Sequence, residues 1–352
     1  MNTYQPHSML VTGGAGFIGA NFIRYVLTHR PAIQIINIDK LTYAGSLENL
    51  QHLPRTANYH FVQGDIIDRE LIESIFKSHD IDTVVHFAAE SHVDRSIAGP
   101  AAFIETNIQG TFTLLETARE EWLNRKKYSS TACRFHHIST DEVFGSLAFD
   151  APSFTETSRY LPRSPYSASK AAADHLVHAY YHTYGLPMTL SNCSNNYGPY
   201  QHKEKFIPTV IAACLNEQPI PIYGLGKNIR DWLYVEDHCR GILRILEQGQ
   251  VGESYGLGGN NEWENLTLAR YICDKFDVLK PLSRPYAELI TSVTDRAGHD
   301  FRYAINTTKI KEHLQWTPLE SFSTGIDKTI QYYLQFLRSD RMTCHDLRKQ
   351  YS

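Results

Sequence analysis

Short apolar runs alternate with longer amphipathic segments over the first two hundred residues. The apolar runs are rich in Val, Ile, Leu and Phe, as in strands that are buried on both faces. They predict strands over residues 9–14, 33–39, 59–65, 83–89, 135–140 and 187–194. Between them, apolar residues recur at helical spacing, which predicts helices over residues 17–30, 68–80, 101–123 and 164–185. This alternation predicts an α/β fold with a doubly wound parallel sheet, whose ligands bind beyond the carboxyl ends of the strands.

The pattern changes after about residue 200, where short elements rich in Pro, Gly and Asn replace the regular alternation. There is no internal repeat and no low-complexity linker, so we expect a smaller lobe that is interleaved with the end of the sheet. We therefore predict three parts. Residues 1–200 form the Rossmann-like sheet domain, residues 201–337 form mainly a smaller mixed α/β lobe for substrate binding, and residues 338–352 form a C-terminal tail.

Charge and composition exclude several classes of protein. The 352 residues include 34 Lys and Arg and 38 Asp and Glu, which are spread along the chain and give a formal net charge of −4. This argues against a nucleic-acid or membrane-surface partner. There is no run of 18 or more apolar residues and no signal-peptide pattern, and the six cysteines lie far apart. We therefore expect a cytoplasmic protein with reduced thiols.

The first predicted strand continues into the glycine-rich sequence TGGAGFIG. Gly13, Gly16 and Gly19 form GxxGxxG, a pattern that permits a tight turn and brings backbone N–H groups close to a pyrophosphate. Asp39 ends the second predicted strand, twenty residues after Gly19. A carboxylate at this position binds the adenosine ribose hydroxyls and repels a 2′-phosphate, so NAD is predicted rather than NADP, although Lys40 weakens that preference. Asp65 suits either the adenine edge or the N-cap of the next helix.

The sequence YSASK places Tyr166 and Lys170 four residues apart on the last predicted helix. Ser164 can cap this helix, Pro165 suits its first turn, and Gly185 marks its end. At this spacing the phenol and the ammonium point the same way. Tyrosine acts as a base near neutral pH only where positive charge stabilises the phenolate, and Lys170 and an oxidised nicotinamide ring can supply that charge. The alternative is a surface pair on an Ala-rich helix.

The strand predicted over residues 135–140 ends in Thr140, followed at once by Asp141 and Glu142. A simple alcohol dehydrogenase needs a hydroxyl donor near its tyrosine, which Thr140 supplies, and no further acid or base. Two neighbouring carboxyl groups therefore indicate additional proton transfers. The alternative is that one of them caps the following turn or pairs with a basic residue.

GxxGxxG and YxxxK in this order resemble the extended short-chain dehydrogenase/reductases. The sequences ISTDEVFG, AAESHVDRSI, SNNYGPYQ, RDWLYVEDH and DRAGHDFRYAI extend the resemblance, from about residue 8 to about residue 337, to the nucleotide-sugar 4,6-dehydratases of that family. The resemblance implies an NAD-dependent hydro-lyase that acts on dTDP-glucose. Oxidation at C4 would acidify the C5 proton, water would leave from C5 and C6, and hydride would return to C6, which yields the 4-keto-6-deoxy sugar.

The resemblance also implies a role for each site residue. Asp141 would be the acid toward the C6 oxygen, Glu142 the base at C5 and Tyr166 the base at the C4 hydroxyl, with Thr140 as a positioning hydrogen bond and Lys170 holding Tyr166 and the nicotinamide ribose. The implied NAD site consists of Gly13, Gly16, Phe17, Ile18, Gly19, Asp39, Lys40, Leu41, Thr42, Asp65, Ile66, Ala88, Ala89, Glu90, Ser91, Thr106, Tyr166, Lys170 and Asn196. The implied sugar-nucleotide site consists of Ser91, Thr140, Asn195, Lys205, Phe206, Pro221, Ile222, Tyr223, Arg230, Asn265, Asp295, Arg296, Ala297, Gly298 and His299.

Arg230 and Arg296 offer forked donors to a diphosphate, and Tyr223 offers a surface for the base. The alternatives are a local ion pair between Arg230 and Asp231 and core packing of Tyr223.

The chain departs from the family pattern at several positions, which leaves the preferred nucleotide base open. Phe144 stands in place of Tyr, Ala297 in place of Pro, His202 and Lys203 in place of an apolar-Pro pair, and Asn306 in place of Asp. Whether the product feeds rhamnose or another deoxysugar is also open.

Three histidines, His175, His178 and His182, share one face of the Tyr166 helix at metal-like spacing. No Cys or carboxylate motif joins them, so we expect surface or interface residues and no metal. His136 and His137 are expected to be hydrogen-bonded strand residues. The family resemblance implies a homodimer that buries two helices of each subunit in a four-helix interface.

Two other functions remain possible from the sequence. A nucleotide-sugar epimerase or decarboxylase has no evident use for the Asp141–Glu142 pair. A non-catalytic dinucleotide-binding module would not need Tyr166 and Lys170.

Overall fold

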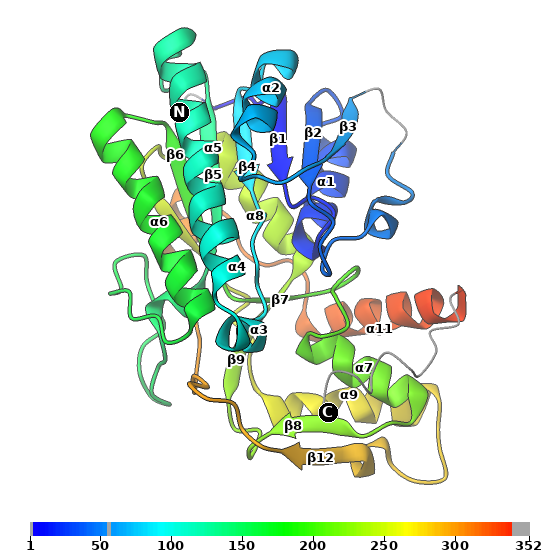
Figure 1. Ribbon diagram of the computed structural model, residues 1–352. Coiled ribbons are helices and arrows are strands. Elements are labelled where there is room, and N and C mark those ends of the chain that lie inside the picture. Colours follow the sequence, from blue (N-terminus) through cyan, green and yellow to red (C-terminus); the bar gives the residue numbers. More distant parts are fainter. Residues whose placement is uncertain (1–2, 55–57, 340–352) are drawn as a thin grey trace.

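Seven parallel strands form the central sheet of the computed structural model, which describes residues 3–54 and 58–339 (Figure 1). The strand order is β10-β6-β5-β4-β1-β2-β3. The strands are β1 (Ser8–Thr12), β2 (Gln34–Asp39), β3 (Tyr59–Gln63), β4 (Thr83–His86), β5 (Arg134–Thr140), β6 (Met188–Cys193) and β10 (Ser254–Leu257). All six strands predicted from the sequence are present. The predicted tail from residue 340 onward, with Cys344, lies outside the described residues.

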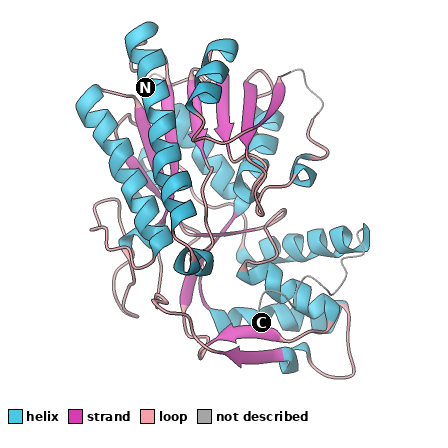
Figure 2. Cartoon of the chain, viewed as in Figure 1, coloured by secondary structure: helices cyan, strands magenta, loops and turns pink. Residues whose placement is uncertain are grey.

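Helices cover both faces of this sheet, and each face has its own apolar core (Figure 2). On one face, α1 (Phe17–His29) and α8 (Val235–Gln248) pack together against the strands. On the other, the cover is α2 (Arg69–His79), α5 (Thr111–Ala118) and α6 (Pro165–Tyr184). Side chains alternate between these cores along the strands: Met9 and Val11 join the first core, whereas Leu10 joins the second. The doubly wound parallel fold predicted from the sequence is therefore confirmed.

The helix predicted over residues 101–123 is present, but it is not uniformly α-helical. It consists of α4 (Ala101–Phe103), a π-helical stretch η2 (Ile104–Gly110), α5, and a second π-helical stretch η3 (Arg119–Arg125). The hydrophobic periodicity predicted the helix, but it carries no signal for the wider turns.

A smaller lobe lies beyond the carboxyl ends of the sheet strands (Figure 1). It contains a three-stranded sheet and a two-stranded sheet around a separate apolar core. Its elements are β7 (Asn195–Tyr197), α7 (Phe206–Asn216), β8 (Ile220–Tyr223), β9 (Ile229–Tyr234), β11 (Glu262–Glu264), α9 (Asn265–Leu279), η5 (Tyr286–Leu289), β12 (Ile290–Val293) and α11 (Phe322–Ser339). The remaining short helices are η1 (Leu47–Leu50), α3 (Val93–Ala98), η4 (Asp141–Phe144) and α10 (Thr308–Leu314).

The chain crosses between the two parts more than once. After β9 it returns to the large sheet, where α8 covers one face and β10 pairs in parallel with β6. Arg30 at the end of α1 forms an ion pair with Glu247 of α8 at 2.7 Å. The sheet therefore includes residues from both sides of residue 200.

Candidate active site

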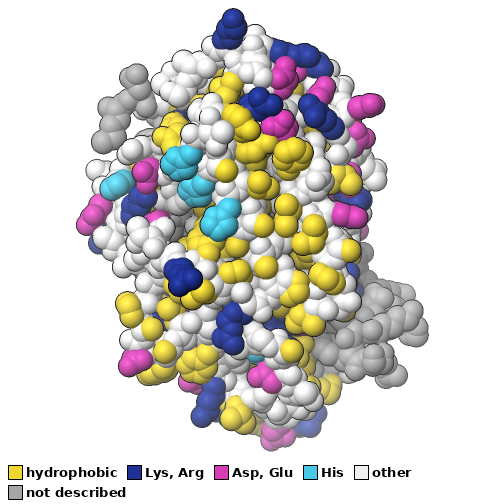
Figure 3. Space-filling view, turned by 60° about the vertical axis from the view of Figure 1, so that its left-hand side comes forward, with side chains coloured by type: hydrophobic (Ala, Val, Ile, Leu, Met, Phe, Trp, Pro, Cys, Tyr) yellow, Lys and Arg dark blue, Asp and Glu magenta, His cyan; other side chains and the backbone are white. Residues whose placement is uncertain are grey.

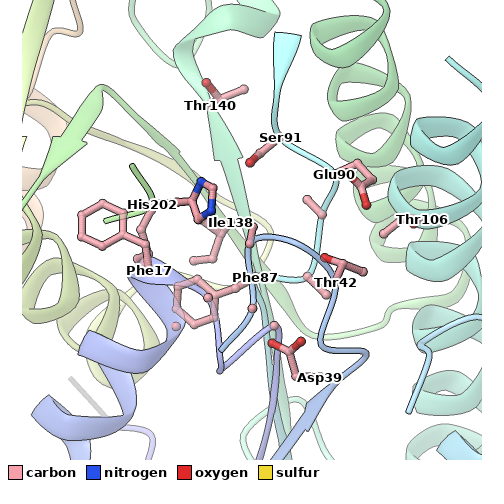
Figure 4. Close-up of a pocket in the computed structure, with 18 of the residues that line it drawn as sticks. Phe17, Asp39, Thr42, Phe87, Glu90, Ser91, Thr106, Ile138, Thr140 and His202 are labelled. Atoms are coloured by element: carbon pink, nitrogen blue, oxygen red, sulfur yellow. The ribbon is translucent and has the colours of Figure 1, made fainter. Parts of the chain in front are cut away.

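One elongated cavity follows the carboxyl ends of six sheet strands. Its walls come from the segments that directly follow β1, β2, β3 and β4, from the end of β5, and from the β6–β7 connection. Figure 4 shows Asp39 and Thr140 toward opposite ends of this cavity. This is the edge at which open parallel sheets bind ligands, as the sequence predicted.

The glycine-rich turn between β1 and α1 leaves no room for side chains. Gly13 has a positive φ of 70°, and a Cβ there would lie 2.7 Å from the backbone of Ala88. A Cβ on Gly19 would lie 2.4 Å from the carbonyl oxygen of Gly13. Gly16 is the N-cap of α1 and has no side-chain cap, so the first N–H groups of the helix are available to an anion. These residues fit the diphosphate of a dinucleotide.

Asp39, at the end of β2, is held in one orientation by the backbone. Its carboxylate accepts hydrogen bonds from the N–H groups of Ala15, at 2.9 Å, and Leu41, at 2.8 Å. Burial raises the pKa of Asp39, while these two hydrogen bonds oppose the rise. A carboxylate fixed at this position fits the adenosine ribose of NAD.

Lys40 and Asp65 form an ion pair with each other at 2.5 Å, across the ends of β2 and β3. The alternative role for Asp65, as N-cap of the following helix, is wrong, because the side chain of Asp68 caps α2 by accepting the N–H of Leu71.

Most of the predicted cofactor residues line the cavity, and Leu41 is the exception. Of the predicted substrate residues, Ser91, Thr140, Asn195 and Lys205 line it as well. The cavity also has lining residues that the sequence analysis did not select: Ile38, Ala44, Gly45, Gly64, Phe87, Ala102, Glu105, Ile138, Ser139, Cys193, Ser194, Gln201, His202 and Glu204. Most of them lie next to predicted residues at a strand end. The predicted strand ends could therefore have been used to find these additional lining residues.

The helix α6 begins as the sequence predicted. Ser164 and Ser167 form a capping box, Pro165 occupies the first turn, and Gly185 ends the helix in the left-handed conformation. Tyr166 and Lys170 therefore sit on consecutive turns of one face, both are buried, and both line the cavity.

Lys170 is held beneath the cavity by β5. Its Nζ donates to the carbonyl oxygen of Ile138 at 2.7 Å and lies 3.3 Å from Nε2 of His137. Burial lowers the pKa of Lys170, and the nearby Asp174 carboxylate opposes this change.

Burial and then the Glu142 carboxylate raise the pKa of Tyr166 well above its usual value, against a hydrogen bond with Thr140. The protein chain alone therefore favours the neutral phenol. Stabilisation of the phenolate by Lys170 together with an oxidised nicotinamide ring stays a prediction.

The predicted catalytic residues Thr140, Asp141 and Glu142 lie where β5 ends and η4 begins, and we call this segment the catalytic corner. Thr140 is the N-cap of η4, and its Oγ1 accepts the N–H of Glu142 at 3.3 Å. The alternative that Asp141 or Glu142 caps this turn is therefore wrong. The Thr140 hydroxyl also donates to Oδ1 of Asp141 at 3.3 Å, and Asp141 Oδ2 has no hydrogen-bond partner among the described residues. Glu142 lines the cavity, whereas the side chain of Asp141 lies just behind its wall.

The two carboxyl groups have different electrostatic surroundings. Burial raises the pKa of Asp141 well above its usual value, and the neighbouring carboxylates of Glu142 and Asp231 raise it further. Burial also raises the pKa of Glu142, but there the cations of Arg296, Arg230 and Lys205 oppose the rise. Divergent surroundings of this kind assign an acid and a base, and they favour Asp141 as the acid and Glu142 as the base.

Arg230 is buried beside this corner and does not pair with Asp231. Its guanidinium donates to the carbonyl oxygens of Ile229 and Asp300 and lies 4.3 Å from the centre of the Tyr303 ring. The Asp231 carboxylate instead accepts the N–H groups of Gly259 and Asn261. The alternative of a local Arg230–Asp231 ion pair is therefore not found.

The other predicted nucleotide residues belong to the smaller lobe and lie outside the cavity lining. Tyr223 is half-buried at the end of β8, where its hydroxyl donates to Asp94 at 3.3 Å. Arg296 Nη1 lies 3.7 Å from the same Asp94 carboxyl group, and His299 pairs with Asp295 at 2.6 Å. The structure thus brings the loop 295–299 close to the end of β8. Phe206 is the first residue of α7, and Asn265 is the first residue of α9. Pro221 and Ile222 belong to β8.

A buried polar network beneath Lys170 was missed by the sequence analysis. Asp174, one turn after Lys170 on α6, accepts hydrogen bonds from Ser139 at 2.7 Å and Tyr160 at 2.9 Å. Its Oδ1 lies 3.2 Å from Nε2 of His137. The spacing of four residues between Lys170 and Asp174 was the signal that could have found it.

The histidines singled out in the sequence lie beside polar or aromatic side chains. Among the described residues, no group of three or more His, Cys, Asp or Glu side chains is arranged to hold a metal ion. His178 accepts or donates a hydrogen bond with Ser254, and the ring of His175 lies 5.2 Å from that of Tyr160. His136 contacts Thr189 and Ser191. Across residues 3–54 and 58–339, no helix is long and apolar enough to span a membrane.

Comparison with known proteins bears directly on this site. Residues 10–329 match the family model described as GDP-mannose 4,6 dehydratase. The chain is 52% identical over 334 residues to a dTDP-glucose 4,6-dehydratase of Salmonella typhimurium, covering 93% of this chain and 92% of the relative. The chain belongs to the dTDP-glucose 4,6-dehydratase family.

Solved structures of this family and of related enzymes share the whole fold. DesIV, the dTDP-glucose 4,6-dehydratase of Streptomyces venezuelae, whose structure has NAD and TYD bound, is 42% identical with a TM-score of 0.86, covering 94% of this chain and 98% of DesIV. The UDP-glucose 4-epimerase of Thermotoga maritima, solved with UDP-glucose, is 28% identical with a TM-score of 0.81, covering 94% and 99%. Dehydratase and epimerase therefore share this architecture, so the residues of the site must decide between the two reactions.

Two departures from the dehydratase pattern have clear structural settings. Phe144 is buried, and its ring lies 5.1 Å from the rings of both Phe154 and Tyr160, so it packs the back of the catalytic corner. His202 lines the cavity, where its ring contacts Tyr43 edge-on at 5.9 Å and its Nδ1 lies 3.6 Å from Glu204. Figure 4 shows His202 near Phe17, in the cofactor part of the cavity. The effect of this departure on the preferred nucleotide base stays a prediction.

Proposed function

We propose that the protein dehydrates dTDP-glucose to dTDP-4-keto-6-deoxy-glucose as an NAD-dependent hydro-lyase, with Asp141 and Glu142 as the acid and base of the elimination. The observation that carries the proposal is the contrast between these two carboxyl groups. Two carboxylates, Glu142 and Asp231, raise the pKa of Asp141 while Arg230 opposes them. At Glu142 the balance is reversed, because the cations Arg296, Arg230 and Lys205 lower its pKa while the carboxylate of Asp300 opposes them. Epimerisation at C4 requires no such pair.

Tyr166 acts at the C4 hydroxyl of the sugar. Its phenolate takes the hydroxyl proton, while Thr140 hydrogen-bonds the phenol and Lys170 is anchored below it by the carbonyl of Ile138. NAD, which the glycine turn and Asp39 would hold, would supply a hydride acceptor for C4, a hydride donor for C6 and a positive ring charge beside Tyr166.

Asp141 and Glu142 act on C6 and C5. Once C4 is a ketone, the C5 proton is acidic and the Glu142 carboxylate removes it. Asp141, which its surroundings keep protonated, donates its proton to the C6 oxygen so that water leaves. Glu142 then returns its proton to C5 as C6 is reduced.

The cations near the corner suit the sugar diphosphate. Arg230, Arg296 and Lys205 approach Glu142 closely enough to influence its pKa, and a diphosphate placed among them would receive forked hydrogen bonds. We propose that the nucleotide lies across β8, the start of α9 and the loop 295–299, because these segments meet on the same side of the lobe.

The reaction can be tested with dTDP-glucose that carries deuterium at C4, with UDP-glucose in parallel. We expect the label at C6 of a 4-keto-6-deoxy product, without net formation of NADH. The ratio of the two rates gives the nucleotide preference. Return of the label to C4 with inverted configuration would instead identify an epimerase, and failure to convert either sugar by NAD-loaded protein would contradict the proposal.

We also propose that two copies of the chain associate through α5 and α6. These helices pack against each other at one side of the sheet, and apolar side chains are spread over that face (Figure 3). Ile104 and Phe112, on the continuous helix that contains α5, and Tyr184, at the end of α6, are exposed large hydrophobic residues. Two helices from each copy would form a four-helix interface that covers them.

Phe112→Glu is expected to convert the dimer to a monomer, because a charge at the centre of an apolar interface is costly to bury. Phe112 is 38% exposed, so the change should leave the fold intact. Sedimentation velocity at several concentrations measures the result. The matched control is Val278→Glu on α9, at a residue that is 83% exposed and lies in the other lobe. A wild-type monomer, or a dimeric Phe112→Glu variant, would contradict the proposal.

A further inference from the structure

The proposed function, on which this inference rests, leaves Tyr166 and Asp141 in changed protonation states after each turnover. The overall reaction converts the sugar nucleotide into product and water, with no net change in protons. Within one turnover, however, Tyr166 gains the proton of the C4 hydroxyl, and Asp141 loses a proton to the departing C6 hydroxyl. Glu142 returns one proton to C5 for the one that it took. After each turnover the protein therefore holds one proton too many on Tyr166 and one too few on Asp141.

The Thr140 side chain lies between these two groups. The Thr140 side chain is near enough to the Tyr166 phenol to lower its pKa, and the Thr140 hydroxyl donates to Oδ1 of Asp141 at 3.3 Å. The N–H of Glu142 also points at Oγ1, at 3.3 Å, and holds the hydroxyl in this position. A hydroxyl can accept one proton while it donates another.

The surroundings offer Asp141 little direct contact with bulk water. The Asp141 residue is 2% exposed, and Tyr166 and Thr140 are 8% exposed. Within the part of the chain that the structure describes, the hydrogen bond to the Asp141 carboxyl group comes from Thr140, and its other oxygen has no partner. Thr140 is thus the neighbour through which a proton can reach Asp141.

We propose that Thr140 is a proton relay that resets the site after each turnover, by passing to Asp141 the proton that Tyr166 took from the C4 hydroxyl. In this step the O–H bond of Tyr166 breaks as a new bond forms at Thr140 Oγ1. The original Thr140 O–H bond breaks as an O–H bond forms at Asp141 Oδ1. No electrons are exchanged with the cofactor. The products are the phenolate of Tyr166 and the carboxylic acid of Asp141, the state in which the next turnover begins.

The carboxylates around Asp141 favour its reprotonation, whereas the raised pKa of Tyr166 opposes loss of the phenol proton, so the transfer also needs the positive charge of an oxidised nicotinamide ring beside the phenol. An ionised Asp141 has the carboxylates of Glu142 and Asp231 nearby and is buried, so it regains a proton readily. The relay also explains why Thr140 contacts both groups. A residue that only positioned the sugar hydroxyl would need no hydrogen bond to Asp141.

Thr140→Val and Thr140→Ser separate the relay from the size of the side chain, because Val keeps the shape and Ser keeps the hydroxyl. Rapid-quench kinetics with excess substrate measure the first and later turnovers separately. For Thr140→Val we expect a burst of one product per active site, followed by a steady state at least tenfold slower. The slow phase should have a normal solvent deuterium isotope effect, which slow product release would not give. Wild type and Thr140→Ser should show no burst.

Thr140→Val also removes the cap of η4, so bound NAD and the melting temperature are measured for each variant. Equal rates of the first and later turnovers in Thr140→Val would overturn the relay, as would a slow phase without an isotope effect or a burst of the same size in Thr140→Ser. Failure of the proposed function looks different, because wild type itself would then form no 4-keto-6-deoxy product.

Discussion

Glu142→Gln is expected to lower kcat by roughly 10²–10⁴-fold, the usual contribution of a positioned general base. The amide has nearly the shape of the carboxylate but cannot take the C5 proton, so water cannot leave from C5 and C6. Oxidation at C4 does not need Glu142. The variant should therefore bind NAD normally and accumulate enzyme-bound NADH when dTDP-glucose is added, instead of completing the cycle.

Proton exchange at C5 is the sharpest measurement of this effect. Glu142 lines the cavity, so its carboxyl group can exchange the C5 proton with solvent before a proton returns to C5. Wild type working in D2O should therefore place deuterium at C5 of the product, and Glu142→Gln should lose this exchange together with turnover. Glu105→Gln is a suitable control, because Glu105 also lines the cavity but belongs to the helical segment η2, away from the catalytic corner. Normal incorporation of deuterium by Glu142→Gln would remove Glu142 from its role as base.

Tyr166→Phe is expected to suppress the first oxidation itself, again by roughly 10²–10⁴-fold, since the base at the C4 hydroxyl is lost. The ring of Tyr166 is buried, and Phe fills nearly the same space, so folding and NAD binding should persist. Formation of NADH in a single turnover, with enzyme in excess over substrate, isolates this step from the elimination. The two variants should thus differ in kind: Glu142→Gln stops after oxidation, whereas Tyr166→Phe stops before it.

A second tyrosine on the same helix provides the control. Tyr180 is also buried on α6, but its hydroxyl donates to Glu116 on α5, far along the helix from the cavity. Tyr180→Phe should oxidise the sugar at nearly the wild-type rate. An unchanged rate in Tyr166→Phe would refute its assignment as the base.

The fold and the composition of the site were predictable because both depend on local spacing. The glycine turn, the strand-terminal Asp39 and the Tyr166–Lys170 pair are set by neighbours in the chain, and the strand ends gather such residues at one edge of the sheet. The capping box of α6 likewise follows from adjacent residues. For the same reason, the sequence could anticipate that Asp141 and Glu142 stand side by side.

The electrostatics of the site could not be predicted in this way. What distinguishes Asp141 from Glu142 comes from Lys205, Asp231 and Arg296, which approach from separate segments of the smaller lobe. Lys170 is another example, because its partners Ile138 and His137 lie on β5 rather than on its own helix. Spacing along the chain carries no information about such distant neighbours, nor about the π-helical turns beside α5.

The return of the chain to the large sheet has a consequence for synthesis on the ribosome. When residues up to the end of β6 have emerged, one edge of β6 is still unpaired, because its neighbour β10 has not yet been made. The ribosome makes β10 only after the first elements of the smaller lobe. Unpaired edges are sites of aggregation, and nascent domains fold as units once their last element is available. A nascent chain stalled near residue 200 should therefore remain protease-sensitive and dependent on chaperones, and the cofactor pocket should become protected only after Leu257 has left the exit tunnel.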